Sequence, residues 1–121
     1  MDVYPALTVV VDHFGRADAG VGTDDEALAE FADLPDSVLV KASAIPALSN
    51  EPFPHLDMEG RIGWLLDEIG RERVAWGSDY PYVSSVSDYE RTLTCLDHME
   101  SLSTADRRWL TERSFARHLG V

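Results

Sequence analysis

Three short runs of apolar, mostly β-branched residues constrain the fold of this chain more than any other feature of the sequence. They span residues 7–13, 38–43 and 73–79. Runs of this length, apolar at successive positions, are typical of strands buried on both faces, as in parallel sheets. Each run ends in a polar residue, and these residues lie 30 and 36 positions apart, about one strand–helix unit: His13, Ser43 and Asp79.

Helical patterns lie between and after the three runs. Apolar residues recur at helical spacing over residues 62–69, which predicts an amphipathic helix. Capping-box patterns predict three further helix starts, at Thr23, Ser87 and Ser103. The segment 44–55 holds three prolines and is expected to be an irregular loop. The order β-α-β-α-β-α-α predicts an α/β fold with a parallel sheet, in one unit over residues 1–121.

The polar strand ends are the candidate functional site. In parallel α/β folds, ligands bind where the carboxyl ends of the strands meet the loops that follow them. Side chains alternate along a strand, so His13 shares a face with Val11, and Lys41 with Ser43. If these faces point the same way, His13, Asp79, and Lys41 or Ser43 line one pocket.

The chemistry that these residues could supply is general. A shielded Asp79 is a candidate general base or ligand for a divalent metal, and His13 a candidate to polarise a carbonyl or carry a proton. Lys41 and Arg16 are candidates to bind a substrate carboxylate. Asp12, on the opposite face from His13, is expected to fix the loop or a neighbouring helix.

Each candidate also has a purely structural interpretation. His13 could be a buried, hydrogen-bonded structural histidine, and Asp79 could bond the backbone of its own turn. Lys41 could extend along the sheet edge into water, and Arg16 could belong to a loop ion pair. The remaining histidines are expected to be solvated: His55, His98 and His118.

Composition excludes several classes of function. The chain has 22 acidic and 10 basic residues, and its net charge of −12 argues against binding of nucleic acid or of an anionic membrane. No apolar stretch approaches the roughly 20 residues of a membrane-spanning helix, and no signal-peptide pattern is present. The single cysteine, Cys95, excludes an intramolecular disulfide and favours the cytoplasm.

The charged residues are also biased in type. Nine of the ten basic residues are arginine, and Lys41 is the only lysine. A densely acidic, lysine-poor surface stays hydrated in concentrated salt, which favours a halophilic host. The alternative is an ordinary acidic protein from a genome whose codons favour arginine.

Four segments together resemble the C-terminal part of the amidohydrolase-related family of TIM-barrel hydrolases and decarboxylases. They are Val-Val-Asp-His-Phe-Gly at 10–15, Val-Leu-Val-Lys-Ala-Ser at 38–43, Arg-Val-Ala-Trp-Gly-Ser-Asp-Tyr-Pro at 73–81, and the helix at 110–119. The most similar branch is that of 2-pyrone-4,6-dicarboxylate lactonase. The resemblance implies that the three runs are strands 6–8 of a (β/α)8 barrel. It also implies that Asp79 is the general base and, in metal-dependent members, a metal ligand.

The chain departs from the family pattern in what it lacks. The His-x-His pair of the first strand and the functional residue of the fifth strand are absent from the 121 residues. A whole barrel takes about 250 residues and eight strands. We therefore expect the last three strands of a barrel rather than a whole one. The exposed strand edges are expected to lead to a partner chain that completes the barrel, to self-association, or to a marginal isolated fragment. A divalent metal such as zinc, or no cofactor, fits this resemblance.

Three functional hypotheses follow. The first is an amidohydrolase-family hydrolase of a carboxylated lactone, ester or amide, with Asp79 as general base and His13 polarising the carbonyl. The second is a non-catalytic barrel remnant that serves as a structural or binding module. The third is an unrelated doubly wound fragment such as a receiver domain, which the mid-chain position of Lys41 argues against.

Overall fold

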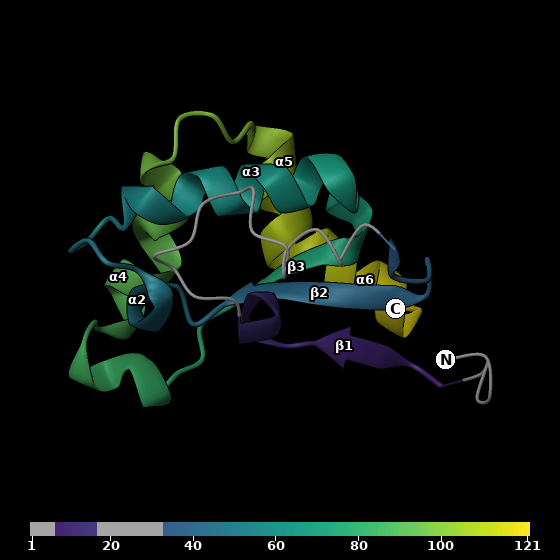
Figure 1. Ribbon diagram of the computed structural model, residues 1–121, viewed down its shortest axis with the longest axis horizontal. Helices are drawn as coiled ribbons and strands as arrows, with labels where there is room; N and C mark the ends of the chain where they lie inside the picture. The colour runs from purple at the N-terminus through teal and green to yellow at the C-terminus, as the bar shows by residue number, and fades with distance from the viewer. Residues whose placement is uncertain (1–6, 17–32) are drawn as a thin grey trace.

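A three-stranded parallel sheet forms the centre of the protein, whose computed structural model describes residues 7–16 and 33–121 (Figure 1). The strands are β1 (Val9–Val11), β2 (Val38–Ser43) and β3 (Val74–Gly77), and β2 lies between the other two. All neighbours are parallel, as the sequence predicted. Both outer strands are shorter than the predicted runs, because the chain turns at their polar ends.

The register of the sheet decides which side chains share a face. Val11 pairs with Val40, and Val11 also packs against the hydrophobic core that contains Val40. Lys41 and Ser43 have the opposite parity on β2 and lie on the other face. The prediction that Val11 shares a face with Lys41 and Ser43 is therefore wrong. The residue beside Lys41 is Asp12, which directly follows β1.

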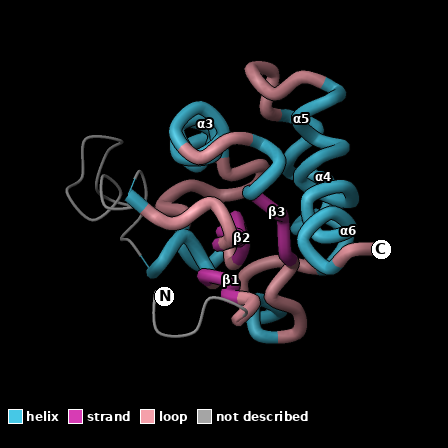
Figure 2. The backbone as a smooth tube through the Cα atoms, turned by 90° about the vertical axis from the view of Figure 1, so that its right-hand side faces the viewer, coloured by secondary structure: helices cyan, strands magenta, loops and turns pink. Residues whose placement is uncertain are grey.

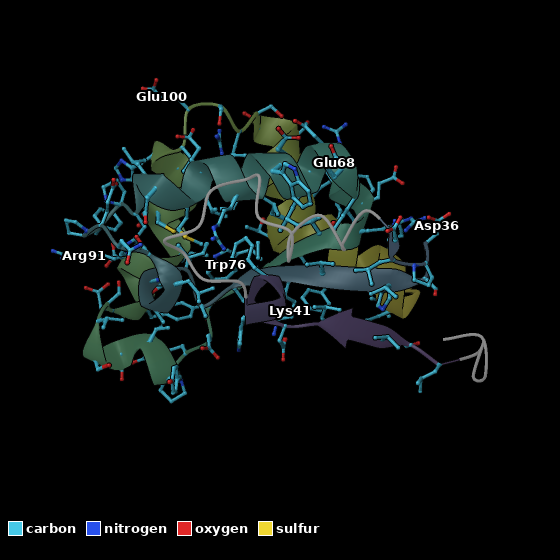
Figure 3. The ribbon with its side chains drawn as sticks, viewed as in Figure 1. Asp36, Lys41, Glu68, Trp76, Arg91 and Glu100 are labelled. Carbon is cyan, nitrogen blue, oxygen red and sulfur yellow. The ribbon has the colours of Figure 1, made fainter. Side chains whose placement is uncertain are left out.

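Helices cover the face of the sheet that carries Val40. They are α3 (Glu59–Glu68), α4 (Tyr89–Thr94), α5 (Thr104–Arg108) and α6 (Ser114–Leu119), and a π-helical segment, Trp109–Arg113, joins the last two. Figure 2 shows α3 over the sheet and α4, α5 and α6 gathered beside β3. Trp76 lies toward α3 and Lys41 on the opposite side (Figure 3).

Two of the predicted helix-start positions, Ser87 and Ser103, lie within the described residues, and each is within one residue of the observed cap. Ser103 caps α5 in a capping box with Asp106, as expected. The cap of α4 is Asp88 rather than Ser87, because the Asp88 carboxylate accepts the hydrogen bond from the third residue of the helix. The helix predicted over 62–69 is α3. The pattern at Thr23 lies outside the described residues.

The proline-rich segment contains a helix that the sequence analysis did not expect. Residues Ile45–Leu48 form α2, with Pro46 in its first turn. Proline is tolerated there because the first backbone N–H groups of a helix have no intrahelical acceptor. The prediction of a wholly irregular loop was wrong on this point.

The core lies between the sheet and the helices. Its largest members are fully buried: Phe14, Val40, Ile45, Met58, Ile62, Leu65, Leu96, Met99 and Leu110. Phe14 directly follows His13, so the core anchors the turn that begins at the end of β1. Among the residues that the structure describes, no helix is long and apolar enough to cross a membrane.

Candidate active site

The polar side chains at the three strand ends form one linked group. The His13 ring Nδ1 lies 2.7 Å from the Ser43 Oγ, and the His13 backbone N–H donates to the same oxygen at 3.1 Å. On the far side of the ring, Nε2 lies 3.5 Å from the Asp79 Oδ1. The structure thus brings together His13, Ser43 and Asp79, the residues that end the three predicted runs.

The hydrogen bonds to Ser43 indicate where the His13 ring carries its proton. The Ser43 oxygen accepts from the His13 backbone N–H, and its single hydroxyl proton is available to Nδ1. The ring proton then resides on Nε2, the atom that faces the Asp79 carboxylate. We assign this tautomer because a neighbouring negative charge stabilises a proton on the nitrogen that faces it.

Backbone turns, rather than strand alternation, bring His13 and Asp79 to the site. His13 begins the short 3-10 helix η1 (His13–Arg16), and Asp79 lies two residues beyond the end of β3. Their φ angles are 53° and 55°, in the left-handed region that residues other than glycine rarely adopt. Such conformations cost on the order of 1–3 kcal/mol and cluster at functional sites.

The two side chains are shielded but accessible. The side chain of His13 is 18% exposed and that of Asp79 is 21% exposed. A small molecule can therefore reach both groups, while the surrounding protein strengthens their electrostatic interaction relative to bulk water. This arrangement suits proton transfer to and from a bound substrate.

Lys41 forms an ion pair with Asp12, the residue directly before His13. The Lys41 Nζ lies 2.8 Å from the Asp12 Oδ1. The hydrogen bond from Lys41 lowers the pKa of Asp12 below its usual value. That Asp12 fixes the loop or a neighbouring helix stays a prediction; its carboxylate contacts β2, and Asp12 directly precedes the turn that begins at His13.

Gly77 lies against the side chains of Lys41 and Ser43. A Cβ atom at position 77 would be 3.0 Å from the Lys41 Cε and 3.1 Å from the Ser43 Cβ. Both distances are shorter than ordinary van der Waals contact, so a larger residue would displace one of these side chains. The sequence analysis gave Gly77 no role, and the available signal was a glycine at the end of a strand.

The predicted substrate-binding residues have different positions. Arg16 ends η1, three residues after His13, and its side chain lies outside what the structure describes. The Ser43 hydroxyl contacts His13, and the Lys41 ammonium contacts Asp12. Binding of substrate by Arg16, Lys41 and Ser43 stays a prediction.

One of the histidines expected to be solvated is buried. His55 is only 3% exposed, its Nδ1 donates to the Glu51 carbonyl at 2.9 Å, and its ring contacts the Phe53 ring edge to face. His98 is exposed, as expected. The chain pattern gave no sign of the difference, because the burial of His55 depends on how the β2–α3 connection folds back.

The described residues do not form a complete zinc site. A catalytic zinc takes three protein ligands, and residues 7–16 and 33–121 contain no cluster of three histidine, cysteine or carboxylate side chains able to hold a metal. His13 and Asp79 supply two donors. Any further donors would have to come from outside the described residues.

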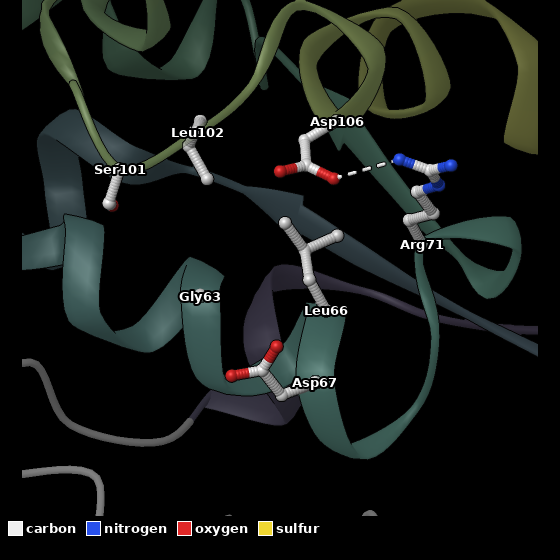
Figure 4. Close-up of a pocket in the computed structure, with 7 residues that line it drawn as sticks. All are labelled: Gly63, Leu66, Asp67, Arg71, Ser101, Leu102 and Asp106. Carbon is white, nitrogen blue, oxygen red and sulfur yellow. Dashed lines mark hydrogen bonds and ion pairs between the residues drawn. The ribbon is translucent and has the colours of Figure 1, made fainter.

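A separate cavity of about 400 Å³ lies among the helices (Figure 4). It is lined by Gly63 and Leu66 of α3, by Arg71, and by the segment 101–106, and Arg71 and Asp106 form an ion pair across it at 3.3 Å. Arg71 precedes β3, so this cavity lies near the amino end of the strand. It is not part of the site at the carboxyl ends.

Comparison with known proteins identifies the family of the chain. Residues 1–113 match the sequence model of the amidohydrolase family. The chain belongs to this family. Members of the family are TIM barrels, and the parallel sheet with its helices fits part of such a barrel. The predicted family is confirmed, and the relatives that the chain resembles are named as hydrolases.

Individual relatives show how much of a barrel the chain represents. It is 31% identical over 77 residues to the 4-sulfomuconolactone hydrolase of Rhizobium radiobacter. The aligned residues make up 61% of this chain and 25% of that protein. A solved structure of a candidate 2-pyrone-4,6-dicarboxylic acid hydrolase from Pseudomonas putida is also similar, with a TM-score of 0.81 and 29% identity. The match covers 95% of this chain and 44% of the Pseudomonas chain.

A second solved structure, an amidohydrolase from Burkholderia multivorans with bound zinc, gives a TM-score of 0.79 and 25% identity. The match covers 99% of this chain and 46% of the Burkholderia chain. The 77 matched residues therefore correspond to a quarter of the curated relative, and the chain spans just under half of each of these two solved structures.

Proposed function

We propose that this chain forms the part of a hydrolase site that contains the general base and the carbonyl-polarising histidine, for a lactone, ester or amide that carries acidic groups. In this proposal β1, β2 and β3 are the sixth to eighth strands of the barrel. The contact of 3.5 Å between the His13 Nε2 and the Asp79 Oδ1 is the observation that carries it. This contact supports the proposal because a possible hydrogen-bond donor, His13, and a possible base, Asp79, lie together at the carboxyl ends of parallel strands. The active sites of barrel enzymes lie at these ends.

The proposed reaction divides the work between the two residues. Asp79 removes a proton from water, and the water oxygen attacks the carbonyl carbon. The His13 Nε2–H donates a hydrogen bond to the carbonyl oxygen as negative charge develops on it. The bond to the leaving oxygen or nitrogen then breaks, and the proton held by Asp79 passes to that atom. Ser43 keeps the ring in the required tautomer.

Two observations support the substrate class: the names of the relatives, and the basic residues of this chain near the site. Both 4-sulfomuconolactone and 2-pyrone-4,6-dicarboxylic acid are cyclic esters that carry acidic groups. Arg16, three residues from His13, is our candidate to bind such a group. The acidic surface of the chain makes a site for anions depend on a few well-placed cations.

The edges of the sheet support a proposal about assembly. β1 and β3 each pair only with β2 among the described strands, so their outer edges present unpaired backbone groups. We propose that further strands of the barrel, from a second copy or a partner chain, cover these edges. Light scattering tests this. A mass above 13.4 kDa at micromolar concentration is expected, and a stable monomer at all concentrations contradicts it.

Hydrolysis of 2-pyrone-4,6-dicarboxylate, followed by ultraviolet absorbance, tests the reaction. We expect turnover that falls at least about 100-fold in Asp79→Asn and in His13→Gln, since positioned acid–base groups contribute about 10²–10⁴-fold. Arg108→Met, which removes an exposed cation remote from the site, is the matched control and should leave turnover unchanged. Equal rates in the wild type and in Asp79→Asn would rule the proposal out.

A second candidate function is binding without catalysis. The incomplete donor set of the described residues favours it, because a zinc-dependent member would need ligands that this part of the chain does not supply. A binding module would bind 2-pyrone-4,6-dicarboxylate in calorimetry without hydrolysing it. Binding that persists in Asp79→Asn, with no turnover in either protein, would favour this second function.

A further inference from the structure

We propose that Lys41 is a positioning residue, which acts through Asp12 to hold the turn that presents His13 to Asp79. The proposal rests on the proposed role of His13. It differs from direct binding of substrate by Lys41, because the ammonium group contacts the Asp12 carboxylate of the same protein rather than a substrate. Three observations support it: the ion pair between Lys41 and Asp12, the hydrogen bonds between Ser43 and His13, and the close approach of Gly77 to Lys41 and Ser43.

Two side chains of β2 hold two successive residues of the turn. The Lys41 Nζ contacts the Asp12 Oδ1 at 2.8 Å, and the Ser43 Oγ accepts from the His13 backbone N–H at 3.1 Å. Lys41 and Ser43 are two positions apart on one strand, so they lie on the same face. β2 therefore holds the side chain of Asp12 and the backbone N–H of His13, the two residues joined by the peptide bond that leads into the turn. The backbone enters the left-handed region at His13.

Glycine at position 77 leaves room for this arrangement. A Cβ atom there would lie 3.0 Å from the Lys41 Cε and 3.1 Å from the Ser43 Cβ, so these neighbours would have to move by a few tenths of an ångström. Lys41 is the more flexible of the two, so we expect a side chain at position 77 to shift its stem. Gly77 thus connects β3, which leads to Asp79, with the two side chains that hold His13.

The contact with Asp12 also limits what else Lys41 does. Its ammonium charge is largely neutralised by the Asp12 carboxylate, so a substrate carboxylate would have to compete with that group. Asp12 is 59% exposed, and ion pairs with an exposed partner have small effects. We therefore expect a local effect on the turn and little effect on the stability of the whole protein.

A double-mutant cycle with Lys41→Met and Asp12→Ala tests the proposal. Hydrogen exchange of the His13 backbone N–H is measured by NMR, which requires no substrate. Each single variant should speed this exchange about three- to fivefold, the size expected for losing a partly exposed ion pair. The double variant should exchange no faster than either single variant, because the two residues act through one contact. Exchange at Ala75 in β3 should not change.

The ring of His13 gives a second readout. At one fixed pH, the ring nitrogen signals of His13 should shift in the same way in both single variants, whereas Arg108→Met should leave them unchanged. A purely structural role of Lys41 would instead speed exchange across the whole sheet, including Ala75, and that result would overturn the proposal. These readouts report the placement of His13 and remain valid even if the proposed hydrolysis fails.

Gly77→Ala provides an independent approach that leaves every charge in place. It should reproduce the faster exchange at His13 by displacing Lys41. Turnover completes the test: the proposal expects Lys41→Met and Asp12→Ala to lower kcat to the same extent at unchanged KM. A rise in KM for 2-pyrone-4,6-dicarboxylate in Lys41→Met alone would show that Lys41 binds substrate directly, and would overturn the assignment.

Discussion

The Nε2 atom of His13 lies 3.5 Å from the Oδ1 atom of Asp79, although the two residues follow the two outer strands of the sheet. The central strand β2 separates β1 from β3, and its last residue, Ser43, holds the other side of the His13 ring. The contact thus depends on both strand pairings at once. Left-handed backbone at both ends of the contact turns the two side chains toward each other.

Removal of the Ser43 hydroxyl should impair turnover more than its small size suggests. In Ser43→Ala the His13 ring loses its partner at Nδ1, and we expect kcat to fall about 10- to 100-fold, as for other residues that orient a functional histidine. Ser114→Ala is the matched control, since that buried hydroxyl donates to the Arg71 carbonyl at the other end of β3. Similar losses of kcat in the two variants would contradict the orienting role of Ser43.

The contribution of the Asp12–Lys41 ion pair should disappear in acid. Lys41 holds the pKa of Asp12 below its ordinary value of 3.8 in the folded protein. A carboxyl group with a lowered pKa stabilises the fold above its unfolded pKa and loses that contribution as pH falls through the folded pKa. The difference in unfolding free energy between the wild type and Lys41→Met should therefore be constant near neutrality, shrink below about pH 4, and be lost only once the pH has passed the lowered pKa of Asp12. A difference that grows in acid would contradict this sign.

Cys95 should be unreactive in the folded protein. Burial raises the pKa of its thiol to about 11, and its Sγ donates to the Thr92 carbonyl. The thiolate is the reactive form, so at pH 8 a disulfide reagent such as dithionitrobenzoate should modify the thiol only at the rate of unfolding. Full reaction should follow in denaturant. Rapid modification of the native protein would show that the helix layer around Cys95 opens readily.

The capping box of α5 should contribute measurably to stability. The Ser103 hydroxyl accepts from the Asp106 backbone N–H, and the Asp106 carboxylate accepts from the Ser103 backbone N–H. Ser103→Ala should lower the free energy of unfolding by about 1 kcal/mol in urea denaturation. Ser85→Ala, at an exposed serine outside any cap, is the control and should change it by less than about 0.5 kcal/mol. Equal effects of the two substitutions would refute the capping role.

Asp106 should keep its charge to unusually low pH. Burial acts to raise the pKa of Asp106, but the hydrogen bonds from Ser103 and the contact with Arg71 bring it below its usual value. The stabilising effect of the Asp106 charge is therefore present above the unfolded pKa and is lost only in stronger acid. Carboxyl carbon signals in NMR, recorded from pH 6 to pH 2, should show Asp106 titrating below the usual range of an aspartate carboxyl.

Local sequence patterns predicted the strand β2, the helix α3 and the cap of α5 because each depends on neighbouring residues alone. Strand pairing was harder, since the face that β1 presents depends on its register against β2. That register placed Val11 on the core side and Asp12 beside Lys41. Strand alternation was thus applied to the wrong face of β1.

The site residues were predicted for a reason that was only partly correct. His13 and Asp79 do meet, but through turns with positive φ rather than through alternation along the strands. No pattern in the chain identifies such turns for non-glycine residues. Burial of His55 was missed for a similar reason, because it depends on the path of a loop that returns to the core.

The linked group of His13, Ser43 and Asp79 also has a consequence for folding. Its members come from three successive strand–helix units, so a chain with only β2 and β3 assembled contains no contact between the imidazole and the carboxylate. Each long crossover must close before the group exists, and loop closure of this kind slows the folding of parallel sheets. The site therefore forms among the last steps of folding, and any signal from it reports a molecule whose whole sheet is in place.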